Sequence, residues 1–345
     1  MPGFGPGNPS LALTARSGFL GRPFAPRMKP SHLLVMVLLN IGWAGTIVIN
    51  KALGSGAGDG PAEGATARPD LPVGGIVTLR FGLAALCMLA LWPCWRGRMP
   101  RGKDFMMSVL IGLAVFVLGQ RMQVLGTLLG TAGNSAILMA VEPLLATVAA
   151  AIFLHEHIGP RRVVGFALSI AGVVVLNRVW EPSFRWTGLL PSLIFMSSFL
   201  CETAYSILGK PIVERASPAK LLTVALVGAT VANLSIDGRD TWRAAQLLHP
   251  TEWLQLSYMA VVCTVIGYTV WLVVIKEAPV NVVAMTIFIQ PVAGVLLAAT
   301  WLQEALHWGQ LWGSLLIVAG LAVALSRQIH TAPVPSPSPG AEAKP

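Results

Sequence analysis

The sequence predicts an all-α polytopic membrane protein with ten transmembrane helices in two inverted five-helix repeats. Hydrophobic residues make up 54% of the 345 residues and charged residues only 11%, whereas soluble domains carry about 25% charged residues. The charges lie between long apolar stretches, which reach the length of about 20 residues that a helix needs to cross a bilayer. A third observation is an internal repeat, whose second copy lies 148 residues after the first. Together these features exclude a soluble fold, and a β-barrel would show short alternating segments instead.

Five apolar stretches lie in each half of the chain. In the first half, residues 31–180, the predicted spans are 32–52, 73–94, 105–128, 134–154 and 163–179. In the second half, residues 186–327, they are 187–208, 219–236, 253–275, 281–302 and 310–327. A long Gly/Ala-rich connection, residues 54–75, follows the first span. The two ends, residues 1–30 and 328–345, have the composition of disordered segments.

The internal repeat supports this division of the chain. Landmark residues recur in one gapless register: Gly119 with Gly267, Glu142-Pro143 with Gln290-Pro291, Glu156 with Glu304, Gly165 with Gly313, and Gly172 with Gly320. A Pro, a Glu and three Gly in one register are not expected by chance, and such a repeat determines the architecture. Because each half has an odd number of helices, the two halves must cross the membrane in opposite orientations.

The distribution of Lys and Arg gives the orientation. With the N-terminus in the cytoplasm, most of these residues fall in cytoplasmic connections, as the positive-inside rule requires. The connection after the fourth span carries Arg161 and Arg162, whereas its counterpart in the second half, residues 307–310, carries neither Lys nor Arg. We therefore expect a multi-pass protein of the cell (inner or plasma) membrane with both termini in the cytoplasm.

Residues 130–176 carry a recognisable pattern: a small-residue helix with Pro143, Glu156 near its end, and a following helix with Gly165 and Gly172. The pattern recurs with Pro291, Glu304, Gly313 and Gly320. It resembles the EamA-type repeat of the drug/metabolite transporter superfamily. The segment TLRFGLAAL also resembles the second helix of that family, which places Arg80 at the position of the family's Arg. The resemblance covers roughly residues 32–327 and implies a ten-helix inverted repeat that transports or exports small metabolites.

The chain departs from the family pattern in three places. The connection Gly54–Gly75 is longer than usual, Arg121 lies in a span that is usually apolar, and Glu142 directly precedes Pro143. The last two bear on the substrate, so the resemblance does not identify one.

Two prolines mark the expected transport pathway. In an inverted-repeat transporter the substrate site lies near the midplane, where the repeats meet. Pro143 and Pro291 each remove a backbone donor and release the carbonyl four residues earlier, at Met139 and Ile287. In a bilayer such a carbonyl needs a partner or a wet cavity. The alternative is a packing kink with nothing bound.

Two carboxylates, Glu142 and Glu202, and two arginines, Arg80 and Arg121, lie well inside predicted spans. Such residues are costly in a bilayer and are functional by default. Glu142 and Glu202 could each hold a cationic group of a substrate or exchange a proton. Alternatively, they pair with Arg80 and Arg121 and join helices.

Polar and aromatic side chains form stripes on several predicted helices. Thr264, Tyr268 and Trp271 share one helix face, and the equivalent stripe in the first half includes Gln120 and Gln123. Further candidates for the pathway are Asn40 and Trp43 on one face of the first span, Tyr205 on the face of Glu202, and Gln290, the repeat counterpart of Glu142. The alternative is helix packing, although lipid would tolerate the polar groups poorly.

Other motifs indicate structure rather than chemistry. Glu156 and Glu304 lie at helix ends, where a structural role is expected. The run His155-Glu156-His157 lacks the spacing of a zinc motif, because Gly159 stands where the second His is needed. The four cysteines form no close pair, and no Walker-type motif is present. We therefore expect no metal, no cofactor, no ATP hydrolysis and no enzymatic activity.

The resemblance and the polar residues together predict a secondary transporter. We expect it to export small polar metabolites, such as amino acids or amines, by alternating access around a midplane site. A lipid-head-group flippase of the same superfamily is the alternative, and a membrane-embedded enzyme is less favoured. The expected partners are a small-molecule substrate and the lipid bilayer, without nucleic acid, and a homodimer is compatible with the sequence.

Overall fold

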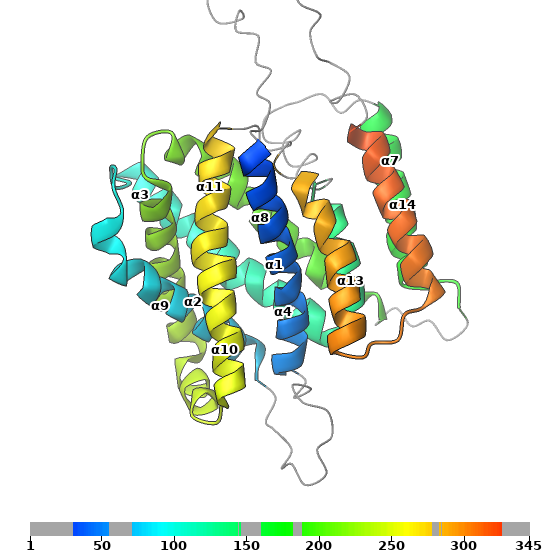
Figure 1. Ribbon diagram of the computed structural model, residues 1–345, viewed down its shortest axis with the longest axis horizontal. Helices are drawn as coiled ribbons and strands as arrows, with labels where there is room; N and C mark the ends of the chain where they lie inside the picture. The colour runs from blue at the N-terminus through cyan, green and yellow to red at the C-terminus, as the bar shows by residue number, and fades with distance from the viewer. Residues whose placement is uncertain are drawn as a thin grey trace, which may run out of the picture.

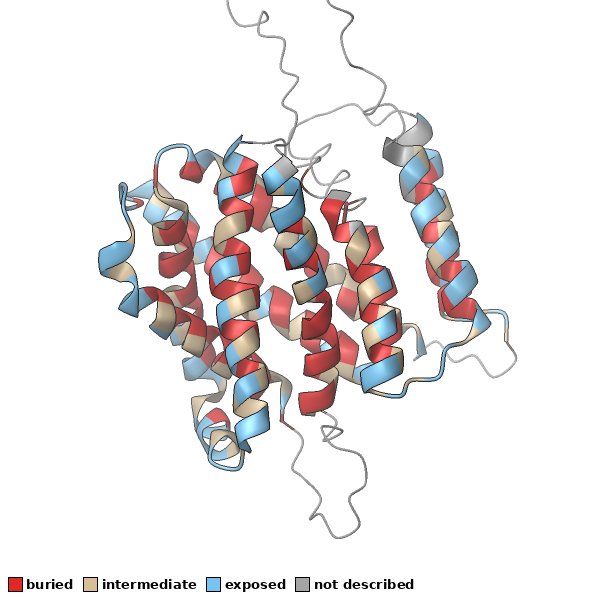
Figure 2. Ribbon diagram, in the orientation of Figure 1, coloured by how far each residue is buried: buried red, intermediate tan, exposed pale blue. Residues whose placement is uncertain are grey.

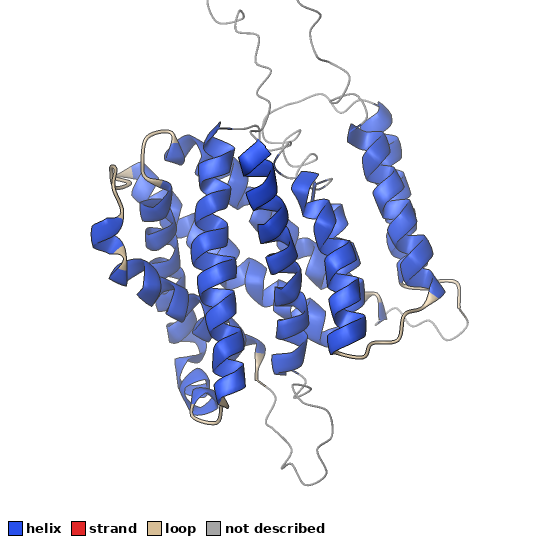
Figure 3. Ribbon diagram, viewed as in Figure 1, coloured by secondary structure: helices blue, strands red, loops and turns tan. Residues whose placement is uncertain are grey.

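The computed structural model describes residues 30–54, 71–143, 145, 160–181, 188–277, 283 and 285–325. These residues form helices and connections, and no strand occurs among them (Figure 3). The first half contains α1 (Pro30–Gly54), α2 (Val73–Ala90), η3 (Trp92–Cys94), α3 (Lys103–Gly112), η4 (Leu113–Gly119), α4 (Gln120–Leu129), α5 (Ala132–Leu138), η5 (Met139–Val141) and α7 (Pro160–Leu176). The second half contains α8 (Leu190–Val213), α9 (Pro218–Ala245), α10 (Pro250–Tyr258), η7 (Met259–Ile266), α11 (Gly267–Glu277), η8 (Met285–Phe288), α13 (Ile289–Trp301) and α14 (Trp308–Leu325).

The length and surface of these helices are those of a multi-pass membrane protein. Six stretches of the described chain are long and apolar enough to cross a bilayer: Ser31–Gly54, Val73–Ala90, Lys103–Leu129, Leu190–Val213, Pro218–Ala245 and Pro250–Glu277. Large apolar side chains on their outer faces are exposed, among them Leu34 at 60%, Leu118 at 56% and Val231 at 61%. Buried residues line the inner faces of the bundle (Figure 2). Lipid tails can cover such an apolar surface, whereas water cannot do so without cost.

Among the described residues a helix lies at each predicted position, with two differences. The seventh helix, α9, continues beyond the expected end at residue 236 to Ala245, through a kink where Asp237 has non-helical φ and ψ. The fourth and ninth helices each contain a 3₁₀ turn ahead of their proline, at η5 and η8. The predicted tails, most of the connection 54–75, Glu156 and the end of the fourth span lie outside the described residues. How many helices cross the bilayer therefore stays a prediction.

The fifth helices of the two halves, α7 and α14, pack against each other through glycines. They lie side by side at one edge of the bundle (Figure 1). A Cβ added at Gly172 would lie 2.8 Å from the carbonyl oxygen of Gly313, and one at Gly320 would lie 2.5 Å from that of Gly165. Small residues let backbones approach in this way in membrane proteins. Because 172 meets 313 and 165 meets 320, these two equivalent helices are antiparallel.

The second helices of the two halves, α2 and α9, are also antiparallel. Thr230 donates a hydrogen bond to the backbone oxygen of Phe81 at 3.3 Å, and Thr78 donates to Asp237 at 3.0 Å. The residue number therefore rises along α2 while it falls along α9. In an inverted repeat, equivalent helices of the two halves run in opposite directions, and the helices of both pairs do so.

Each half has a π-helical segment in its third helix, η4 and η7. A π turn closes i→i+5 hydrogen bonds and frequently occurs at functional sites. The segments end at Gly119 and Ile266, directly ahead of the residues that begin α4 and α11. The same local distortion thus occurs at nearly equivalent places in both repeats.

The glycine contact of α7 and α14 gives a first prediction. Gly172→Val should lower the stability of the detergent-solubilised protein by about 1–3 kcal/mol, because its side chain meets the Gly313 carbonyl, which cannot move aside. The melting temperature would report the loss. Ala171→Val, on the exposed face of the same helix, is the matched control and should have little effect. Equal melting temperatures for the two variants would contradict this packing.

Candidate functional site

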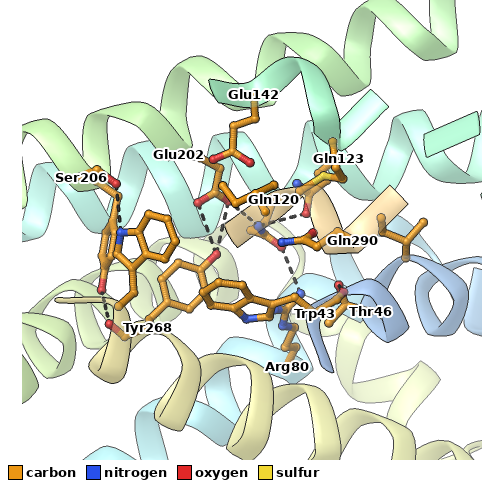
Figure 4. Close-up of a pocket in the computed structure, with 15 residues that line it drawn as sticks. Trp43, Thr46, Arg80, Gln120, Gln123, Glu142, Glu202, Ser206, Tyr268 and Gln290 are labelled. Carbon is orange, nitrogen blue, oxygen red and sulfur yellow. Dashed lines mark hydrogen bonds between the residues drawn. The ribbon is translucent and has the colours of Figure 1, made fainter. Parts of the chain in front are cut away.

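A pocket lies between the two halves, and its space of about 610 Å³ free of protein atoms includes open solvent. We call it the central pocket (Figure 4). The residues that line it are Trp43, Thr46, Ile47, Arg80, Gln120, Gln123, Met139, Glu142, Glu202, Tyr205, Ser206, Tyr268, Trp271, Ile287 and Gln290. They come from α1, α2, α4, η5, α8, α11, η8 and α13, with Glu142 directly after η5.

Much of the pocket wall comes from equivalent positions of the repeat. Four pairs of lining residues are each separated by 148 positions: Gln120 with Tyr268, Gln123 with Trp271, Met139 with Ile287, and Glu142 with Gln290. Three of the four members in the first half are polar or acidic, whereas two of the four in the second half are aromatic. The frame of the pocket is therefore symmetric, while its chemistry is not.

Gln120 joins the two charged groups at the centre of the pocket. Its amide oxygen accepts a hydrogen bond from Nη1 of Arg80 at 3.1 Å, and its amide nitrogen donates to Oε1 of Glu202 at 2.7 Å. Arg80 and Glu202 are thus linked through an amide rather than by direct contact. Arg80 is only 3% exposed, and its Nε also donates to the hydroxyl of Thr264 at 3.2 Å.

Aromatic side chains form the opposite wall. The Tyr268 hydroxyl donates to Glu202 at 3.3 Å, and Nε1 of Trp271 donates to the Ser206 hydroxyl at 3.1 Å. The ring of Trp43 lies 5.8 Å from that of Tyr268 and 5.9 Å from that of Trp271, between centroids. These distances are typical of favourable aromatic pairs. The result is an apolar surface with fixed polar tips next to a carboxylate.

The π segment η7 and a glycine position Trp43. The indole Nε1 donates to the backbone oxygen of Cys263 within η7 at 2.7 Å. A Cβ added at Gly267 would lie 2.8 Å from that nitrogen, so the glycine makes room for the indole. The equivalent Gly119 likewise admits α8, because a Cβ there would lie 2.8 Å from Cβ of Cys201. At both glycines of the repeat, the lack of a side chain therefore lets a neighbouring helix approach closely.

Glu142 enters the pocket next to Glu202. Figure 4 shows its carboxylate turned towards that of Glu202. Within the described part of the chain no side chain donates a hydrogen bond to it. The adjacent Pro143 and the equivalent Pro291 do not contribute to the wall. Met139 and Ile287, whose carbonyls the prolines release, do line it.

Two further predicted residues lie behind the wall and support it. Asn40 accepts a hydrogen bond from Nε2 of Gln290 at 2.6 Å and donates to Thr286 at 2.9 Å. Thr264 is fully buried and contacts Arg80. It does not line the pocket with Tyr268 and Trp271, and its hydroxyl donates to the backbone oxygen of Met259 at 2.9 Å.

Arg121 contacts neither glutamate of the pocket. Its Nη1 forms an ion pair with Oδ2 of Asp237 at 2.9 Å, and its Nε and Nη2 donate to Asn233 at 3.0 and 2.8 Å. Asp237 fits here because Gly74 has no side chain: a Cβ at that position would lie 1.5 Å from Oδ2. The interpretation that Arg121 pairs with Glu142 or Glu202 is therefore wrong. Asp237 was missed because the expected helix ended one residue before it.

Glu304 caps a helix of the other half. Its two carboxylate oxygens accept hydrogen bonds from the backbone N–H groups of Ala132 and Gly133, at 2.8 and 2.9 Å, at the start of α5. At the end of α4, directly before α5, Lys51 donates to the backbone oxygens of Leu128 and Gly130. A carboxylate at a helix N-terminus and an ammonium at a C-terminus both complement the helix dipole.

Five lining residues were absent from the sequence-based site. Thr46 and Ile47 follow Trp43 by three and four residues, and Ser206 follows Glu202 by four, so helical spacing could have found all three. Met139 and Ile287 were expected only as backbone acceptors. Among the residues that the structure describes, no three His, Cys, Asp or Glu side chains lie together as a metal site requires.

Comparison with known proteins agrees with the fold and the repeat. The family model of the EamA-like transporter family matches residues 30–178 and 189–326. A "probable amino-acid metabolite efflux pump" of Escherichia coli (strain K12) is 26% identical over 202 residues, 56% of this chain and 67% of that protein. A "probable terminal-alkyne amino-acid exporter" of Streptantibioticus cattleyicolor is 23% identical over 229 residues, 65% of this chain and 74% of the relative. One crystal structure, at 17% identity, shares the fold with a TM-score of 0.55 over 86% of this chain and 98% of its own. Since the family model covers most of both halves, the chain belongs to the EamA-like transporter family.

Proposed function

We propose that this protein is a secondary transporter that exports small polar metabolites, such as amino acids, amines or related compounds. The central pocket carries the proposal. It combines ionisable and aromatic side chains from both halves, and in inverted-repeat transporters the substrate binds between the repeats. Rocking of one half against the other would expose the pocket to each side in turn. In this proposal both termini lie in the cytoplasm, and the protein resides in the cell membrane.

Two relatives support export and the class of solute. One is described as an amino-acid metabolite efflux pump and the other as an amino-acid exporter. The pocket offers what an α-amino acid needs, namely a guanidinium at Arg80 for a carboxylate and Glu202 for an ammonium group. Arg and carboxylate side chains form the strongest hydrogen bonds to such charged partners.

The experiment is solute counterflow by the purified protein in proteoliposomes, with amino acids and amines as solutes. Glu202→Gln should lower the rate of transport by about tenfold or more, because hydrogen bonds to charged groups contribute about 1.5–3 kcal/mol. Glu214→Gln is the matched control, since Glu214 is exposed directly after the same helix. It should transport as the wild type does.

Two results would contradict the proposal. Unchanged transport by Glu202→Gln would remove the carboxylate from the pathway. Transfer of a fluorescent phospholipid between leaflets, with no solute moving under any gradient, would instead identify a lipid flippase.

A further inference from the structure

Glu142 and Gln290 occupy the same position of the repeat, one residue before the proline, and both line the central pocket. The two side chains have nearly the same shape and differ in charge. In the second half an amide fulfils every requirement of the fold at this position. An acidic group at Glu142 is therefore not needed to build the helix, its kink or the wall.

The charges of the pocket are unbalanced. Its 15 lining residues include two carboxylates, Glu142 and Glu202, and one cation, Arg80. Glu202 already accepts hydrogen bonds from Gln120 and Tyr268. Arg80 is held by Gln120 and Thr264, and its guanidinium lies 4.9 Å from the centroid of the Phe81 ring. Glu142 is the acidic group for which the described part of the pocket supplies no donor.

The surroundings of these carboxylates suit an organic cation. Trp43, Tyr268 and Trp271 line the pocket, and aromatic rings attract ammonium groups that lie over their faces. A carboxylate in a membrane interior is costly unless an opposite charge accompanies it. A bound ammonium group would provide that charge, in addition to the one that Glu202 can hold.

We propose that Glu142 makes the pocket selective for solutes with a second cationic group, such as dibasic amino acids or diamines. In this arrangement Arg80 and Glu202 bind the carboxylate and ammonium of an α-amino acid, and Glu142 binds the additional ammonium. The inference rests on the proposed transport function and specifies its substrate class. Neutral amino acids would enter the same pocket but leave Glu142 without a counter-charge.

The test compares two probes that differ in one group. L-lysine carries an ε-amine, and L-norleucine has the same carbon chain without it. In proteoliposomes the wild type should transport L-lysine at least about tenfold better, by kcat/KM, than L-norleucine. Glu142→Gln should bring the ratio close to one, because an amide of nearly the same shape does not supply the charge that pairs with the ε-ammonium group. Glu142→Asp should keep the preference.

Binding to the detergent-purified protein, measured as thermal stabilisation by each probe, separates the two proposals. Equal transport of both probes by the wild type, or an unchanged ratio in Glu142→Gln, would overturn the role of Glu142 and leave the transport function standing. Stabilisation of the wild type but not of Glu142→Gln by L-lysine, without transport of either probe, would support the cation site and contradict the transport function. No transport and no stabilisation by either probe would overturn both.

Discussion

Asp237→Ala is expected to destabilise the protein by about 3 kcal/mol, the lower end of the range for breaking a buried ion pair. The substitution leaves Arg121 without its carboxylate, in a place where the two side chains are only 21% and 18% exposed. It also removes the acceptor of Thr78. The melting temperature of the detergent-solubilised protein would show a large decrease.

A second pair on the same helix serves as the control for this prediction. Asp240 and Arg243 lie 3.7 Å apart with side chains that are 72% and 78% exposed, and such surface pairs contribute at most about 1 kcal/mol. Asp240→Ala should therefore have almost no effect. The double variant Arg121→Ala, Asp237→Ala should lose less than the sum of the single variants, since neither partner is left alone. Additive losses would show that the ion pair does not stabilise the contact between α4 and α9.

Gln120→Leu is expected to lower transport by about 100-fold, because one substitution removes the hydrogen bonds to two charged groups, each worth about 1.5–3 kcal/mol. Leu fills similar space but can neither accept from Arg80 nor donate to Glu202. Without the amide between them, the guanidinium and the carboxylate are no longer held apart for a substrate. KM and kcat in proteoliposome counterflow would measure the effect.

The neighbouring amide provides the matched control. Gln123 lines the same pocket one turn further along α4, and among the described residues its side chain accepts one hydrogen bond of 3.3 Å, from Gln120. Gln123→Leu should therefore retain transport within about tenfold of the wild type. Equal losses in the two variants would mean that the effect is not specific to the hydrogen bonds of Gln120. Normal transport by Gln120→Leu would remove the link between Arg80 and Glu202 from the mechanism.

The fold follows from the sequence to the extent that the bilayer imposes it. A span needs about 20 apolar residues, so the positions of the helices are readable from composition. The recurrence of Gly165 and Gly172 as Gly313 and Gly320 also predicts equivalent helices, which the structure packs against each other. The π segments η4 and η7 have no such signal, because a uniformly apolar stretch looks the same in sequence whether it forms α or π turns. Asp237 lies at a kink and pairs with Arg121, which is distant in sequence.

The candidate site was predictable where helical spacing and the repeat agree. Gln120 and Tyr268 share a position of the repeat, and the structure brings both to Glu202. Which donor meets which acceptor was not predictable, because that depends on the distances between helices. For this reason the sequence offered Arg80 and Arg121 as equal partners for the glutamates, whereas Arg80 lies in the pocket and Arg121 binds Asp237.

The cap that Glu304 places on α5 has a consequence for assembly. A ribosome releases Ala132 and Gly133 long before it reaches Glu304, which lies 171 residues after Gly133. Until then the N–H groups at the start of α5 need another acceptor, such as water or a lipid head group, because unpaired groups are costly in a bilayer. Lys51, by contrast, is already present when the carbonyl groups of Leu128 and Gly130 emerge. The contacts of Lys51 with the end of α4 can therefore form during synthesis of the first half. The cap of Glu304 on α5 can form only after most of the second half has been made.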